Sequence, residues 1–176
     1  MSDIQAEKIP AKLIRKYHTR DPFFIAEMLN IEVMKRDDFT KLKGAFKVVE
    51  ELPFIFINAN LSDEMQRLVC AHELGHAMLH RNIRPQGIME FEMFDITNDL
   101  EYDANVFAAN LLLDEDEIYE MACEGVDVVQ IAHTMNTNVN LVLVKLAEIN
   151  KKRHMFNLPE NPEKGFLGKI KDTDGY

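Results

Sequence analysis

Apolar residues recur at intervals of three and four along most of the chain, which is the period of an α-helix with one buried side. The pattern predicts two leading helices at 10–18 and 21–29, and helices at 99–113, 128–135 and 139–150 in the C-terminal half. The most regular stripe follows Ser62 and predicts a long helix with a buried face. Its members are Met65, Leu68, Val69, His72, His76 and Leu79.

Several of these helices also carry recognisable start signals. Asp21 followed by Pro22 is typical of an N-cap and a first helical residue. The acidic run 114–117 favours the start of a further helix, because carboxylates stabilise a helix N-terminus, and Gly125 is expected to end that helix.

Residues 31–58 have a different pattern, with β-branched and aromatic runs at 31–34, 45–49 and 54–57. Gly44 and Pro53 separate these runs. The third run is apolar enough to predict that both of its faces are covered, or nearly so. We expect an α+β fold in which a small antiparallel three-stranded sheet packs against a helical half. Residues 1–156 are predicted to form a single domain, followed by an irregular C-terminal tail at 157–176.

Composition and charge narrow the function classes. The formal net charge is -10, so the average surface field repels nucleic acid phosphates and anionic lipid. No stretch approaches the roughly 18 apolar residues of a membrane span. Cys70 and Cys123 have no paired spacing, which suits a reducing compartment. We therefore expect a cytoplasmic protein with no direct nucleic acid partner and no membrane contact.

Two segments offer weak alternatives in favour of DNA binding. Cations gather at 145–153, but such residues also complement the dipole at the end of a helix. Residues 128–146 loosely resemble a helix-turn-helix, yet Lys145 is the lone cation on the would-be recognition helix. We interpret both segments as ordinary helix packing, and His133 within the second as structural.

The pentapeptide His72-Glu73-Leu74-Gly75-His76 carries the strongest chemical signal. Two histidines four residues apart lie about one turn apart on one face of a helix, which suits chelation of a metal ion. A catalytic zinc site keeps three protein ligands and one position open to water. Glu73 projects from the edge of the chelating face, where it can remove a proton from that water.

A third ligand is expected from the helix at 99–113, which offers Glu101, Asp103 and Asn105. Glu101 lies on the same stripe as small apolar residues that can pack against the helix carrying His72 and His76, so we predict Glu101 as the ligand. Asp103 lies about 200° away on the helical wheel and is expected to be a solvated charge. Asn105 is either an acceptor for a ligating histidine or an ordinary helix-face amide. His80 either supports the site or is structural.

The residues around the candidate ligands resemble those of a known protein family. The strings HELGHAMLH at 72–80 and EYDANVFAANLL at 101–112 resemble the ImmA/IrrE family of metallopeptidases, as do the strand at 54–58 and the segment 17–29. The resemblance covers about two thirds of the chain and excludes the C-terminal tail. It departs from the family pattern at Asp103, where many members have Glu or Gln, and at Asp114, where Pro is frequent.

The resemblance implies a zincin-like minimal metalloprotease of the gluzincin type, with zinc as its cofactor. It also implies a protein substrate, a helix-turn-helix repressor whose cleavage relieves repression of a mobile element or a stress regulon. The alternative is a metal-binding module that sequesters a repressor without proteolysis. Manganese or iron can occupy a similar ligand set.

Two further features leave alternatives open. The segment 88–94 is rich in Met and Phe and either lines a substrate cleft or packs in the core. A residue that stabilises the oxyanion is also expected, and the sequence does not choose among the candidates. These candidates are Tyr102, Tyr119, His80 and His133.

Overall fold

The computed structural model describes residues 2–80 and 99–153. These residues form helices and three short strands, as the pattern of the sequence predicts. In chain order the elements are α1 (Ser2–Tyr17), α2 (Pro22–Met28), β1 (Glu32–Arg36), β2 (Gly44–Val49), β3 (Leu52–Asn58), α3 (Asp63–Leu79), α4 (Asp99–Leu112), α5 (Glu115–Cys123), α6 (Val128–Thr134) and α7 (Val139–Arg153).

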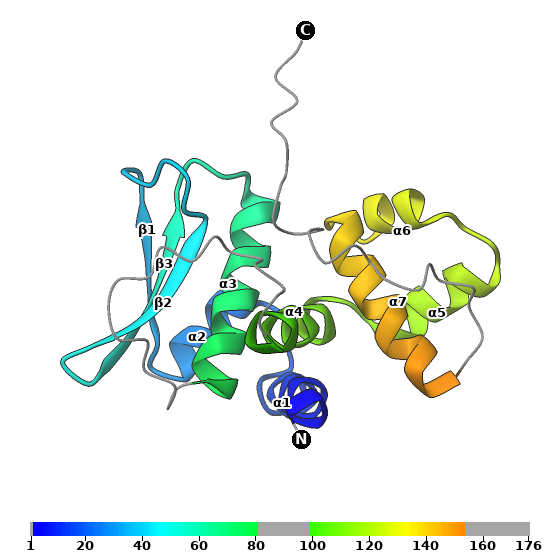
Figure 1. Cartoon of the computed structure of the whole chain (residues 1–176), viewed down its shortest axis with the longest axis horizontal. Coiled ribbons are helices and arrows are strands. Elements are labelled where there is room, and N and C mark those ends of the chain that lie inside the picture. Colours follow the sequence, from blue (N-terminus) through cyan, green and yellow to red (C-terminus); the bar gives the residue numbers. More distant parts are fainter. Residues whose placement is uncertain (1, 81–98, 154–176) are drawn as a thin grey trace, which may run out of the picture.

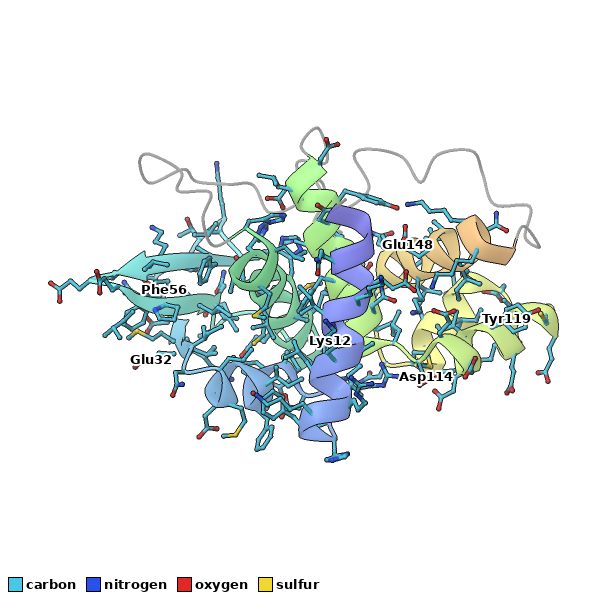
Figure 2. All side chains as sticks on the ribbon, turned by 90° about the horizontal axis from the view of Figure 1, so that it is seen from below. Lys12, Glu32, Phe56, Asp114, Tyr119 and Glu148 are labelled. Carbon is cyan, nitrogen blue, oxygen red and sulfur yellow. The ribbon has the colours of Figure 1, made fainter. Side chains whose placement is uncertain are left out.

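The sheet lies at one end of the molecule and α5, α6 and α7 lie at the other, as Figure 1 shows. Helix α3 packs against β2 and β3, and α4 packs between α3 and α7. Helix α1 crosses the middle of the molecule against α4, as can be followed from below in Figure 2. The expected α+β class is therefore confirmed. Within the described ranges, no helix has the length and hydrophobicity needed to cross a membrane.

The sheet is mixed, so the expectation of a fully antiparallel sheet was wrong for one strand. The strand order is β1-β3-β2; β2 runs antiparallel to β3, while β1 runs parallel to β3. Glu50 and Glu51 close the β2–β3 hairpin with positive φ angles of 50° and 70°, as a two-residue hairpin turn requires. Residues 37–43 take the chain from β1 to the far edge, which leaves the central position for β3.

Within the described part of the chain, strand β3 is fully buried on one face and half-buried on the other. Ile55 and Ile57 are fully buried beneath α3. Phe54 and Phe56 point to the opposite face and are half-buried, with their ring centroids 6.0 Å apart. Alternating side chains explain this difference, because the described helices that contact the sheet lie on one side of it.

The helix ends largely follow the sequence signals. The Asp21 carboxylate accepts a hydrogen bond of 3.0 Å from the backbone N–H of Phe23, with Pro22 as the first helical residue. Helix α1 begins at Ser2, however, well before the expected start at residue 10. Pro10 removes one backbone hydrogen bond within this helix, but packing of α1 against α4 outweighs that local loss.

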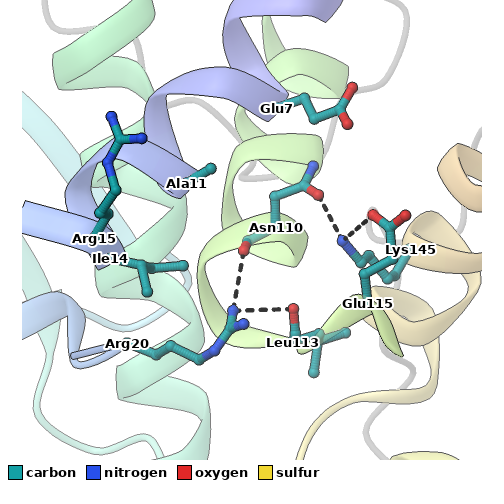
Figure 3. A pocket seen from close by; sticks show the side chains of 9 residues that line it. All are labelled: Glu7, Ala11, Ile14, Arg15, Arg20, Asn110, Leu113, Glu115 and Lys145. Atoms are coloured by element: carbon teal, nitrogen blue, oxygen red, sulfur yellow. Dashed lines mark hydrogen bonds and ion pairs between the residues drawn. The ribbon is translucent and has the colours of Figure 1, made fainter. Parts of the chain in front are cut away.

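Lys145 of α7 is buried rather than presented to a partner, which argues against the helix-turn-helix alternative. Its side chain is 3% exposed and donates to Asn110 Oδ1 at 2.7 Å and to Glu115 Oε2 at 3.2 Å. Arg20 donates to backbone carbonyls at the end of α4, beside a cavity of about 310 Å³ (Figure 3). Arg20 therefore ties the segment between α1 and α2 to the end of α4, and Lys145 ties α7 to α4 and α5.

Gly75 lies where α3 packs against α4. A Cβ atom at this position would lie 3.1 Å from Ala104 Cα, 3.2 Å from Ala104 O and 3.2 Å from Phe107 Cβ. Contacts this short leave no room for a side chain unless one helix moves. The glycine thus offsets its cost in helix propensity by letting the two helices approach each other closely.

The substitution Gly75→Val is expected to lower the free energy of unfolding by about 1–3 kcal/mol, because the added methyl groups overpack the contact between α3 and α4. Urea denaturation of the metal-free protein measures this change. The same side chain at the exposed helical position Ala11 is the control, with an expected loss of at most about 0.7 kcal/mol. Equal stability of Gly75→Val and the parent would contradict the close approach.

The predicted tail at 157–176 and the segment 88–94 lie outside the described residues. Their expected roles, and the domain boundary at residue 156, stay predictions.

Candidate metal centre

Helix α3 supplies two histidines of the candidate site. The hydroxyl of Ser62 caps the helix by accepting a hydrogen bond of 3.2 Å from the backbone N–H of Met65. Ten residues after this cap, His72 is almost fully buried, and the side chain of His76 one turn later is 19% exposed. Their Nε2 atoms lie 3.1 Å apart, so the spacing of four places both imidazoles on one face as expected.

Helix α4 brings Glu101 to the same point. Its Oε2 lies 3.2 Å from His72 Nε2, and its Oε1 lies 3.3 Å from His76 Nε2. One ligand atom from each residue falls within 4.8 Å of the other two. The three residues predicted as ligands are therefore close together, while their ligation of a metal stays a prediction.

The protonation of His72 can be assigned from its neighbour Asn105. His72 Nδ1 lies 2.9 Å from Asn105 Oδ1. Because an amide oxygen only accepts, His72 donates from Nδ1, and in the neutral ring Nε2 then keeps its lone pair. Asn105 thus takes the first of the two roles that the sequence left open for it.

The geometry of the cluster fits a divalent cation. The Nε2 atoms and the Glu101 carboxylate are buried acceptors that face one another, and Glu101 Oε2 makes no hydrogen bond with any described residue. Such an arrangement is costly unless protons or a cation lie between the acceptors. Two imidazole nitrogens and one carboxylate are also a ligand set found in catalytic metal sites with an open position.

The charge state of Glu101 is suited to binding a cation. Burial raises the pKa of this carboxyl group, but when protons lie on the Nε2 atoms, hydrogen bonds and charge attraction from His72 and His76 lower the pKa by more. The resulting pKa lies well below the ordinary value, so Glu101 is ionised near neutral pH. The cluster therefore offers one negative charge to a metal ion.

Glu73 lies on the side of α3 that faces β2. It is buried, and the nearby backbone of Phe46 lowers the pKa of its carboxyl group by less than burial raises it. A Cβ atom on Gly44 would lie 2.4 Å from Val69 Cγ1 and 3.3 Å from Glu73 Cγ, so only glycine allows β2 this close to the helix. Burial raises the pKa of Glu73 to about 7. A carboxyl group with such a pKa can both take up and return a proton near neutral pH.

Asp103 is buried, which corrects the expectation of a solvated charge. It is 2% exposed, and its Oδ2 lies 3.7 Å from His80 Nε2. Asp103 does lie away from Glu101 on the helical wheel. The prediction of a solvated charge assumed that the side of α4 opposite Glu101 faces water. Helix α4 instead packs against α1, α3 and α7, so that side is also covered.

Tyr102 was one of four candidates for stabilising the oxyanion. Its hydroxyl donates to Glu148 Oε1 at 2.7 Å and accepts from Lys151 Nζ at 3.2 Å. Burial and the Glu148 carboxylate raise the pKa of Tyr102 to about 12. Tyr102 thus anchors α7 to α4. Tyr119 and His133 belong to α5 and α6, which pack against α7, and the oxyanion role stays unassigned.

Comparison with known proteins finds relatives of this chain. A 36% identical stretch of 102 residues, 58% of this chain and 64% of the relative, aligns with "Uncharacterized immunity region protein 2" of Bacillus phage phi105. "Metallopeptidase ImmA" of Bacillus subtilis (strain 168) is 25% identical over 139 residues, covering 78% of this chain and 81% of the relative. The aligned part thus spans less than two thirds of the phage protein.

The sequence model of the peptidase M78 family, described as the IrrE N-terminal-like domain, matches residues 26–147. The match covers more than half of the chain and contains the whole histidine and glutamate cluster. The resemblance to the ImmA/IrrE family is therefore confirmed, and this chain belongs to the peptidase M78 family of IrrE N-terminal-like domains.

Proposed function

We propose that this chain is a zinc-dependent endopeptidase in which His72, His76 and Glu101 hold the metal and Glu73 is the general base. The convergence of the three acceptors beside a buried carboxylate with a raised pKa carries the proposal. A bound zinc ion supplies Lewis acidity, which activates a water molecule and polarises a carbonyl group. Glu73 takes the proton from the attacking water and returns it to the nitrogen of the leaving amine.

The open edge of β2 supports a peptide as the substrate. In the described part of the chain β2 is an edge strand, and Pro53, which has no N–H, pairs with Val48. That pair is therefore not hydrogen-bonded. Hydrogen-bonded and non-hydrogen-bonded pairs alternate along an antiparallel ladder, so the pairs that contain Phe46 and Gly44 are not hydrogen-bonded either. A hydrogen bond of 2.8 Å from Asn58 N–H to the carbonyl of Lys43 fits this alternation.

The backbone groups of Gly44, Phe46 and Val48 thus face away from β3, and the side chain of Glu73 lies beside β2 at Gly44. An extended peptide that adds to this edge as a further strand passes beside the general base. This placement favours hydrolysis of extended polypeptide segments over reactions of small molecules.

We further propose that the substrate is a helix-turn-helix transcriptional repressor, and that its cleavage relieves repression of a mobile element or a stress regulon. The support is the resemblance to the ImmA/IrrE family, together with two relatives named for an immunity region and for a metallopeptidase. In this proposal the protein acts in the cytoplasm and touches the repressor rather than DNA. The net charge of -10 agrees with a protein partner.

Removal and return of the metal tests this function. The zinc-loaded protein is incubated with a purified helix-turn-helix repressor, and mass spectrometry follows the products. We expect two defined fragments from the loaded protein, none after chelation, and recovery of cleavage when zinc is added back. A repressor that stays intact in a stable complex with the loaded protein would instead support sequestration and overturn the proposal.

A further inference from the structure

His80 lies directly behind His76, on the side away from Glu101. It caps the C-terminus of α3, where its backbone N–H donates to the carbonyl of His76 at 2.9 Å. Its side chain is 9% exposed, and its Nδ1 lies 3.2 Å from His76 Nδ1. His76 thus faces His80 with its Nδ1, while its Nε2 faces His72 and Glu101.

The contact between the two histidines determines where their protons lie. Two ring nitrogens 3.2 Å apart need one proton between them. If His76 Nε2 keeps its lone pair for a metal, the proton belongs to His76 Nδ1, and His80 Nδ1 accepts it. Neutral His80 then carries its own proton on Nε2.

Asp103 favours this arrangement from the other side of the ring. Its Oδ2 lies 3.7 Å from His80 Nε2, which is longer than a hydrogen bond but close enough for electrostatic attraction. A negative charge at this place favours the tautomer with a proton on Nε2. Asp103 therefore supports the acceptor role of His80 Nδ1.

We propose that His80 is a positioning residue of the metal centre: it accepts the Nδ1 proton of His76, and Asp103 sets the tautomer of His80. Each histidine then has an acceptor for its Nδ1 proton. His72 has Asn105 of α4, and His76 has His80 at the end of its own helix, α3. Partners of this kind fix the orientation of a ligating ring and raise its basicity. The inference rests on the proposed metal site.

Two substitutions of His80 distinguish the hydrogen-bond acceptor at Nδ1 from the size of the side chain. Asn places an amide oxygen near the position of Nδ1, whereas Gln places a polar group near Nε2 and leaves no acceptor at Nδ1. Metal affinity is measured by competition between each purified variant and a chromophoric chelator for zinc. We expect His80→Gln to bind zinc about 10- to 100-fold more weakly than the parent, and His80→Asn to lose far less.

Two further variants complete the experiment. Asp103→Asn keeps the shape but removes the charge, so we expect a loss of affinity between those of the two His80 variants. His133→Asn changes an exposed histidine on α6 and is the matched control, with unchanged affinity. The absorption spectrum of the cobalt-substituted protein gives a second readout, which should change in His80→Gln and not in His133→Asn.

Parental affinity in His80→Gln, or equal losses in His80→Gln and His80→Asn, would overturn the positioning role, because either result makes the acceptor irrelevant. These readouts do not depend on cleavage of a substrate. A zinc-loaded parent that fails to cleave, with the predicted order of affinities intact, would refute the peptidase function and leave the role of His80 in place.

Discussion

Glu73→Gln is expected to abolish proteolysis while zinc stays bound. Glutamine keeps the shape of the side chain where it packs against β2 at Gly44, so the fold and the position of β2 are preserved. It cannot take up a proton, so the rate of cleavage should fall by about 10²- to 10⁴-fold. Initial rates of fragment formation, together with the zinc content of the purified protein, measure the two parts of this prediction.

The matched control is Glu64→Gln, which makes the same change at an exposed position on the same helix. This variant should cleave at the parental rate. Continued proteolysis by zinc-loaded Glu73→Gln would show that another group removes the proton from water. Loss of zinc from Glu73→Gln would show that Glu73 is a ligand rather than the base.

Glu101→Ala is expected to remove metal binding itself. Glu101 is the proposed ligand that carries a negative charge, and the substitution leaves two imidazoles that compete poorly for a divalent cation. Because loss of an outer hydrogen-bonding partner already costs about 10- to 100-fold in affinity, loss of this ligand should cost at least about 100-fold. Proteolysis should be lost with the metal.

Thermal unfolding with and without zinc gives an independent readout for Glu101→Ala. A ligand present at 1,000 times its dissociation constant stabilises the folded state by about 4 kcal/mol, so zinc should raise the melting temperature of the parent and not that of the variant. Glu120→Ala on the exposed side of α5 is the control and should respond to zinc as the parent does. An equal zinc response in Glu101→Ala would assign the charged ligand to a different residue.

The candidate site was predictable because its signals are local. The spacing of His72 and His76 fixes their common face once α3 forms, and Ser62 marks where that helix starts. Glu101 could be chosen from α4 because its neighbours on the same stripe are small and apolar. Each of these inferences needs only the geometry of one helix and the requirement that its apolar side be covered.

The errors arose where packing between distant elements decides the outcome. Asp103 appeared solvated because its sequence does not reveal that α1 and α7 cover the remaining sides of α4. The parallel pairing of β1 depends on which edge of β3 is free after the hairpin has formed. The sequence left the role of His80 open for the same reason, because its neighbour Asp103 lies on another helix. Sequence periodicity shows which side of an element is apolar, but not what lies against it.

Anomalous diffraction at the zinc edge, from crystals of the zinc-loaded protein, locates the metal and its ligands. We expect one strong peak about 2.0–2.2 Å from Nε2 of His72, Nε2 of His76 and a carboxylate oxygen of Glu101, with the fourth position open to solvent. A peak elsewhere, or a fourth amino acid in the open position, would contradict this prediction.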